Sequence, residues 1–149
     1  MLDRLQAFHV AREAVRFYTA PADRFGMGSV GPQFDRRPIL IRQLALDELL
    51  DDLGGGDVDV IKLDVEGSEG VLQGLTRRLT ASRFPRGLFE FCDWAEERVG
   101  GQQPGAAQAF LHSLGYTTFR LGRRGDPGVL VDQPISIGSA MLVSHRSEA

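Results

Sequence analysis

Three charged side chains alternate with apolar ones along a single predicted strand. Lys62, Asp64 and Glu66 stand at every second position, and the positions between them hold isoleucine, leucine and valine. Because successive side chains of a strand point to opposite faces, the three charges share one face, with Cα atoms about 6 to 7 Å apart at each step. Two carboxylates so placed can accept a proton from a substrate hydroxyl or bind a divalent cation, and the lysine would offset their repulsion. Of these two chemistries we expect the one without a metal.

Two interpretations of this charged strand remain open on spacing alone. In an open α/β sheet, ligands bind in the crevice outside the carboxyl ends of the strands, and Asp64 and Glu66 fall at that end. Gly67, directly after them, permits a close turn into the next helix. Alternatively, the charged residues form a buried ion cluster, or the carboxylates cap the N-terminus of that helix, whose partial positive charge favours them.

The sequence around the charged strand predicts the elements that must position it. Strands are expected over residues 15–19, 39–41, 60–65, 88–92, 117–121, 129–131 and 137–143, and helices over 44–53, 69–80 and 106–114. Residues 2–14 fit a helical stripe, although no cap residue fixes its start. Alternating strands and helices, followed by strands in hairpin order, indicate an α/β layer fold.

Composition limits the classes of function. The 149 residues suit one domain, which we assign to residues 1–149. The formal net charge of −3 argues against a nucleic-acid surface, which normally shows a basic excess. The first residues do not resemble a signal peptide, and no stretch approaches the roughly 20 apolar residues of a membrane span. The sequence therefore favours a cytoplasmic protein that binds neither nucleic acid nor membrane.

A glycine-rich segment, Gly26–Gly31 with the sequence GMGSVG, matches the dinucleotide-binding pattern G-x-G-x-x-G. That pattern requires a strand before it and a helix that begins at its end, because the phosphates sit on the helix N-terminus. Residues 21–24 are not strand-like, and Pro32 and Pro38 argue against a helix directly after the segment. We therefore interpret it as a loop, and we assign no cofactor-binding residue.

Residues 58–69, with the sequence VDVIKLDVEGSE, closely resemble the motif around the fourth strand of FkbM-family methyltransferases. In that family an apolar helix of the v-L-x-G type follows the motif, here at residues 71–74 (VLQG). Three further segments are similar to the family pattern: residues 44–50 (LALDELL), 87–91 (GLFEF) and 114–116 (LGY). The resemblance spans about residues 15–143.

The resemblance implies an S-adenosylmethionine-dependent methyltransferase of the class I fold. This fold has a Rossmann-like sheet with helices on both faces and late antiparallel strands. Many members of the family methylate hydroxyl groups of small molecules or sugars. Carried over to this chain, Asp64 and Glu66 become catalytic residues, with Asp64 the first candidate for the base. Lys62 and Glu90 become substrate-binding residues on the same rim.

One part of the family pattern is missing upstream of the first predicted strand. Only 14 residues precede Val15, whereas three βα units of about 30 residues each need roughly 90. The resemblance therefore implies the C-terminal half of such a domain, without the N-terminal strands that bind the cofactor. Two outcomes are compatible with this: a truncated methyltransferase, or an inactive remnant or interaction module that lacks cofactor binding.

Half of a doubly wound sheet would also leave an edge to be covered. The strand at 60–65 would keep an unpaired edge, and Ile61, Leu63 and Val65 would be unprotected. Such an edge is a template for pairing with another chain. We therefore expect a homo-oligomer or association with a complementing N-terminal half, besides the small-molecule hydroxyl substrate that the resemblance implies.

Overall fold

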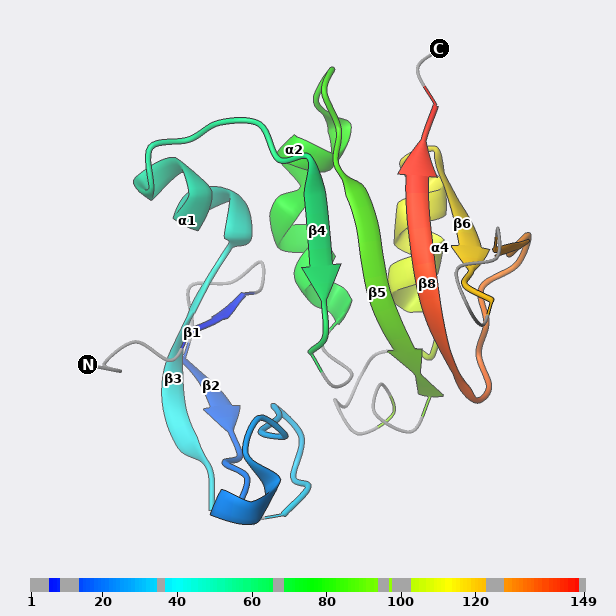
Figure 1. Ribbon diagram of the computed structural model, residues 1–149. Helices are drawn as coiled ribbons and strands as arrows, with labels where there is room; N and C mark the ends of the chain where they lie inside the picture. The colour runs from blue at the N-terminus through cyan, green and yellow to red at the C-terminus, as the bar shows by residue number, and fades with distance from the viewer. Residues whose placement is uncertain are drawn as a thin grey trace.

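The computed structural model describes residues 6–8, 14–34, 37–65, 69–93, 97, 103–122 and 128–147, and these ranges form two β-sheets (Figure 1). The larger sheet has the spatial order β4 (Val60–Leu63), β5 (Arg86–Cys92), β8 (Ser139–Arg146), β6 (Tyr116–Arg120) and β7 (Val129–Leu130). β4 and β5 run parallel, and the other neighbouring strands run antiparallel. The mixed α/β class and the strands expected in this sheet are confirmed, with bounds that differ by a few residues.

The helical segments alternate with these strands along the chain. α1 (Leu46–Asp52) precedes β4, η2 (Glu69–Leu75) and α2 (Thr76–Thr80) connect β4 to β5, and α4 (Ala106–Ser113) precedes β6. The helix predicted over 69–80 therefore has a 3₁₀ first half, where two glycines lower the α-helix propensity. One of them, Gly74, also allows close packing, because a Cβ there would lie 3.3 Å from the backbone nitrogen of Leu46.

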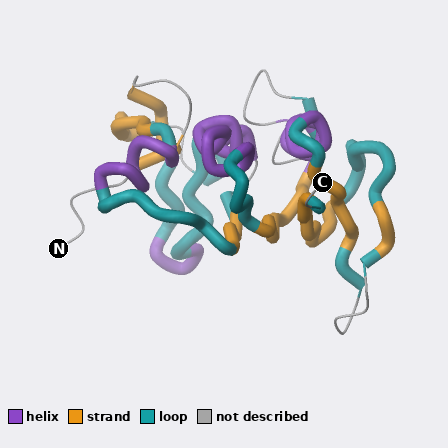
Figure 2. Tube along the Cα trace, turned by 90° about the horizontal axis from the view of Figure 1, so that it is seen from above, coloured by secondary structure: helices purple, strands orange, loops and turns teal. Residues whose placement is uncertain are grey.

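The hydrophobic core lies on one face of the larger sheet, and Figure 2 shows the helices on that side of the strands. The buried side chains come from alternate strand positions and from the covering helices, and they include Ile61, Leu63, Phe89, Phe91, Leu142, Leu72, Leu75, Leu79 and Leu111. The opposite face is open, with Val60 64% exposed and Met141 38% exposed. The described helices next to this sheet pack on the same face, so the expectation of helices on both faces is not confirmed and stays a prediction.

The expectation that Ile61, Leu63 and Val65 are unprotected is also wrong. Ile61 and Leu63 are 8% and 7% exposed, and the partly buried Val65 packs against the core. Strand alternation then places Lys62, together with Val60, on the open face. The edge of β4 is as expected: within the described residues β4 is the terminal strand of its sheet.

The smaller sheet comes from the first third of the chain. Its order is β1 (Gln6–Phe8), β3 (Ile39–Leu44) and β2 (Ala14–Phe17), with the short 3₁₀ segment η1 (Ala22–Arg24) between β2 and β3. β1 pairs parallel with β3, whereas β2 pairs antiparallel with it. The helical interpretation of residues 2–14 is thus wrong at β1, because pairing with the distant β3 overrides the local pattern.

Two aspartates of α1 and two arginines of α2 form an aspartate–arginine cluster: Asp47, Asp51, Arg77 and Arg78. The backbone N–H of Arg77 and Nη1 of Arg78 donate hydrogen bonds to the Asp47 carboxylate, each at 2.8 Å. Nη2 of Arg78 and Nη2 of Arg77 donate to Asp51 at 2.8 and 2.6 Å, and these hydrogen bonds lower the pKa of Asp51. Because Asp47 is only 6% exposed, the cluster ties α1 firmly to the helices that follow the charged strand.

Candidate active site

The end of β4 presents two of the predicted site residues at the surface. Nζ of Lys62 lies 3.1 Å from Oδ2 of Asp64, and the two side chains are 61% and 53% exposed. Lys62 therefore makes the compensating ion pair that its spacing indicated. The alternative of a buried ion cluster is contradicted for these two residues, since both remain in contact with solvent.

Glu90 lies on the neighbouring strand and on the same face. Lys62 pairs in register with Leu88, so Glu90 stands two residues further along β5 and is exposed. With strands about 4.8 Å apart and a rise of about 6.6 Å per two residues, the Cα atoms of Lys62 and Glu90 are about 8 Å apart. The structure thus brings Lys62, Asp64 and Glu90 together, whereas Glu66 lies outside the described residues.

Stability does not explain why this strand carries exposed charges. A solvent-exposed ion pair contributes about 0 to 1 kcal/mol, and lysine and aspartate are depleted from strands. The position explains them better, because Asp64 and Glu90 fall at the carboxyl ends of two adjacent parallel strands. Ligands of open α/β sheets bind at that end.

The carboxyl end of β5 is fastened to the segment that leads into β8. The backbone N–H of Gly138 donates to Oδ2 of Asp93 at 2.6 Å, and the N–H of Asp93 donates to the carbonyl of Gly138 at 3.0 Å. In the same segment, Ile135 exchanges two hydrogen bonds with the buried amide of Gln108, at 2.9 and 3.1 Å. This support was not predicted from the sequence, where its one local signal is Asp93, a carboxylate directly after the predicted strand 88–92.

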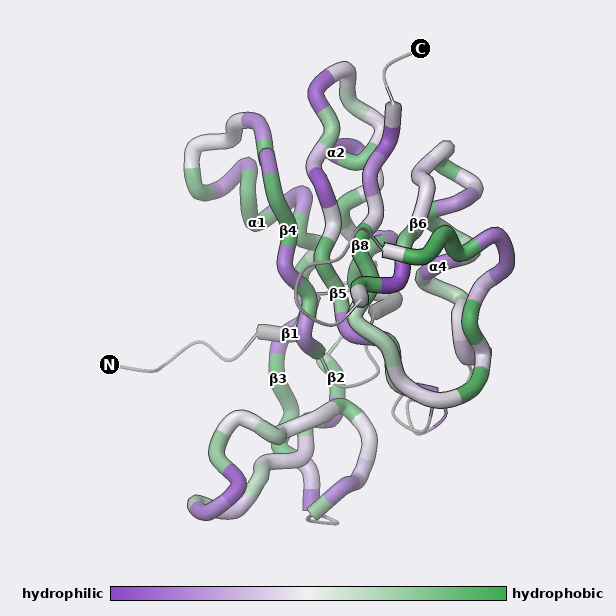
Figure 3. Tube along the Cα trace, turned by 45° about the vertical axis from the view of Figure 1, so that its right-hand side comes forward, coloured by the Kyte–Doolittle hydropathy of each residue, from purple (hydrophilic) through white to green (hydrophobic). Residues whose placement is uncertain are grey.

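At the level of Lys62, the open face of the larger sheet changes from charged at β4 to apolar at β5 and the strands beyond it. In register, Lys62 is followed across the sheet by Leu88, Val143, Phe119 and Leu130. Figure 3 shows hydrophobic and hydrophilic segments interleaved along these strands, as expected for strands with one buried face. A ligand held by the carboxylates would therefore border an apolar surface on the β5 side.

The glycine-rich segment Gly26–Gly31 lies next to β2. Within Gly26–Gly31, Ser29 forms a bridge to Tyr18 and its hydroxyl donates to the carbonyl of Gly31. A Cβ at Gly28 would lie 2.6 Å from Cζ of Phe17, so this glycine is required for packing in the smaller sheet. The next described element is β3 and not a helix, which confirms the interpretation of this segment as a loop.

Two further properties of the described ranges bear on the candidate site. Within these ranges, no three His, Cys, Asp or Glu side chains come together as metal ligands. None of the helices found there combines the length and the apolarity that crossing a membrane requires.

A family model described as a methyltransferase FkbM domain matches residues 4–118 of the chain. The matched range contains β4, β5 and the three charged residues that the structure brings together. No curated protein and no solved structure matches the chain.

Proposed function

Because the chain belongs to the family of FkbM methyltransferase domains, we propose that it serves the S-adenosylmethionine-dependent methylation of a small-molecule or sugar hydroxyl. One observation carries this proposal. Lys62, Asp64 and Glu90 share one face at the ends of two adjacent parallel strands, within the part of the chain that the family model covers.

The roles of these residues follow from their chemistry. The Asp64 carboxylate orients the acceptor hydroxyl and takes its proton as the oxygen forms the new bond, with Glu66 the second candidate for this role. Lys62 holds Asp64 through the ion pair, and both Lys62 and Glu90 bind further polar groups of the acceptor. When bound, S-adenosylmethionine would supply the methyl group as an electrophile, and its methyl–sulfur bond would break to leave the sulfur as a neutral thioether. The contribution of the chain is then mainly alignment.

A second candidate function has support of its own. Within Gly26–Gly31, which matches the dinucleotide-binding pattern, Gly28 is packed against Phe17, and Lys62 and Asp64 lie on an open surface that water reaches. Both observations favour an inactive remnant or interaction module that does not bind the cofactor.

A methyl-transfer assay decides between these functions. The chain is incubated with S-adenosylmethionine labelled in its methyl group and with panels of small-molecule and sugar hydroxyl compounds. We expect a labelled methyl ether, identified by mass, from at least one panel member. Complete absence of transfer, at cofactor concentrations well above its dissociation constant, would favour the inactive remnant.

Cofactor affinity is measured in parallel by calorimetric titration. We expect a dissociation constant no tighter than about 1 mM, because the described residues offer few contacts to the nucleotide. A micromolar dissociation constant would contradict this expectation.

A further inference from the structure

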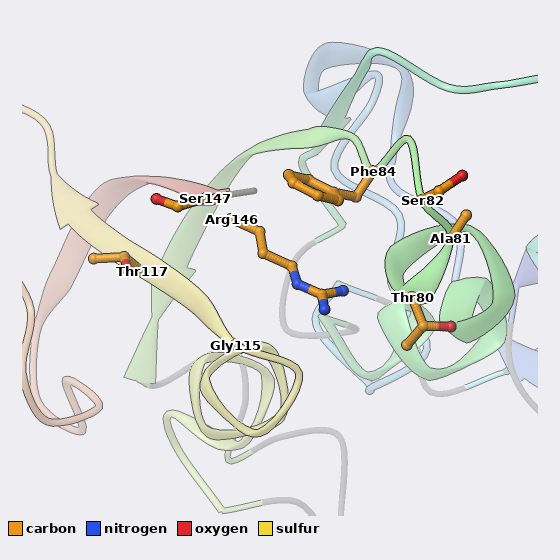
Figure 4. A pocket seen from close by; sticks show the side chains of 8 residues that line it. All are labelled: Thr80, Ala81, Ser82, Phe84, Gly115, Thr117, Arg146 and Ser147. Carbon is orange, nitrogen blue, oxygen red and sulfur yellow. The ribbon is translucent and has the colours of Figure 1, made fainter. Parts of the chain in front are cut away.

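A hollow of about 400 Å³ lies at the end of the larger sheet opposite to the carboxylates (Figure 4). It is bordered by the start of β5, the start of β6 and the end of β8. Its lining includes the side chains of Thr80, Ser82, Phe84, Thr117, Arg146 and Ser147. The volume falls within the range of small-molecule sites.

The guanidinium of Arg146 is held in this hollow by an aromatic ring. Cζ of Arg146 lies 5.3 Å from the ring centroid of Phe84, and that ring is packed edge-on against Tyr116 at 6.2 Å. The Arg146 side chain also lies close to Gly115, since a Cβ added at Gly115 would be 3.7 Å from Nε of Arg146. Figure 4 shows the side chain extending between Phe84 and Thr80. The stacking fixes the cation without using its N–H donors.

The N–H donors of the Arg146 guanidinium have no carboxylate partner within the described part of the chain. Arg77, Arg78 and Arg83 each make ion pairs with aspartates, at distances from 2.5 to 3.7 Å. Arg146 makes no such pair with a described residue, and the residues that line the hollow include no aspartate or glutamate. The hollow is therefore a cationic site with N–H groups available to an anion.

The hydroxyl groups at the rim indicate the class of anion. The Thr80 hydroxyl already donates to the carbonyl of Thr76 at 2.8 Å, but Ser82 and Ser147 are exposed and can turn toward a ligand. A guanidinium fork with several hydroxyl donors suits the three or four oxygens of a tetrahedral oxyanion better than the two of a carboxylate.

We propose that this hollow binds a phosphate group, held by Arg146 on the ring of Phe84. A phosphate ion fills only part of 400 Å³, so the organic part of a phosphate monoester would occupy the remainder. The site is separate from the carboxylates and does not depend on methyl transfer.

The proposal is tested by titrating the chain at constant ionic strength with inorganic phosphate, and separately with phenyl phosphate, while amide NMR shifts are followed. We expect saturable shifts at Gly115, Ser82 and Ser147, with tighter binding of phenyl phosphate. Arg146→Met should weaken binding at least about tenfold, since it removes a charge-assisted bidentate contact. Arg120→Met is the matched control, because Arg120 is an exposed arginine of the adjacent strand and should change binding by less than about twofold.

Tyr116 provides a readout that does not require a folded Arg146→Met variant. Burial raises the pKa of Tyr116, and the nearby charge of Arg146 lowers it. Phosphate bound at Arg146 should therefore raise the Tyr116 pKa further, and Arg146→Lys, which keeps the charge, should bind with intermediate affinity. Linear shifts without saturation, equal weakening by Arg120→Met, or a Tyr116 pKa that phosphate leaves unchanged would each overturn the proposal.

Discussion

Lys62 and Asp64 are exposed residues on a strand whose alternate positions are buried. Ile61 and Leu63 anchor β4 in the core, which leaves the open face free to carry residues selected for another purpose. A carboxylate with its own lysine 3.1 Å away is held in one place while remaining accessible to a ligand. This combination suits a residue that must orient a substrate hydroxyl.

The first prediction concerns the energy of that ion pair. In a double-mutant cycle with Lys62→Gln and Asp64→Asn, the coupling free energy should stay below about 1 kcal/mol, because both side chains are more than half exposed. Urea denaturation of the four proteins measures it. A coupling of several kcal/mol would make the pair a structural element and would remove the argument for function.

At the scale of elements, the aspartate–arginine cluster determines where the helices next to the site lie. Asp47 lies in the segment 44–50 (LALDELL), which resembles the family pattern, and it accepts hydrogen bonds from residues about thirty positions later. The cluster therefore fixes α1 against α2, the helix that leads into β5.

The second prediction is that Asp47→Asn lowers the free energy of unfolding by about 2 to 4 kcal/mol. The substitution removes the charge that balances Arg78, whose side chain is 11% exposed. Asp52→Asn is the control on the same helix, and it should cost less than about 0.5 kcal/mol because Asp52 is exposed. Urea denaturation measures the free energy of unfolding of both variants. An equal decrease in the two would show that the cluster does not stabilise the packing of α1 against α2.

The third prediction is the pH dependence of the same cluster. Hydrogen bonds from two arginines lower the pKa of Asp51 in the folded state below its ordinary value of 3.8. The stability that Asp51 contributes to the folded protein is therefore fully present above pH 3.8. It is lost as the pH falls through the pKa of the folded state. The stability difference between wild type and Asp51→Asn should thus be constant at neutral pH and shrink below about pH 4. If the stability difference between wild type and Asp51→Asn stayed unchanged down to about pH 2, the arginine hydrogen bonds would not be the source of the stability that Asp51 contributes.

Strands were the most predictable elements, since their signals are local. The alternation around Lys62 and the apolar run before Cys92 sufficed for β4 and β5. The helix at 69–80 was only half correct, because Gly74 is retained for its contact with the start of α1 and not for helix formation. The role of Asp47 and the pairing of β1 with β3 depend on distant partners, which no local pattern encodes.

In the candidate site, too, local features could be predicted from the sequence and long-range contacts could not. Lys62, Asp64 and Glu90 could be predicted because each charge interrupts an apolar strand pattern. The support from Gly138 and Gln108 could not, because these bonds depend on how loops distant in the sequence fold against β5 and α4.

At the scale of the whole molecule, the larger sheet that the described residues form has one open face and ends in two terminal strands, β4 and β7. The described helices next to this sheet cover one side of it, and β4 is the terminal strand next to β5. Unpaired strand edges next to exposed apolar side chains such as Val60 promote pairing with another chain. The two proposed sites lie at opposite ends of this sheet, so ligands at one leave the other accessible.

The fourth prediction is that the chain associates through the β4 edge when it is expressed alone. Light scattering across a range of concentrations should show a dimer or larger species. A cooperatively folding monomer at all concentrations would contradict this prediction.

The central claim is that Asp64 belongs to a methyltransferase site, and a pair of matched variants tests it most directly. Asp57 resembles Asp64 in exposure, at 59% against 53%, and in having a surface ion pair, with Arg83 at 3.5 Å. In the methyl-transfer assay, Asp64→Asn should lower the rate by about 100-fold or more, whereas Asp57→Asn should change it by less than about threefold. Equal effects of the two substitutions on the methyl-transfer rate would contradict the claim.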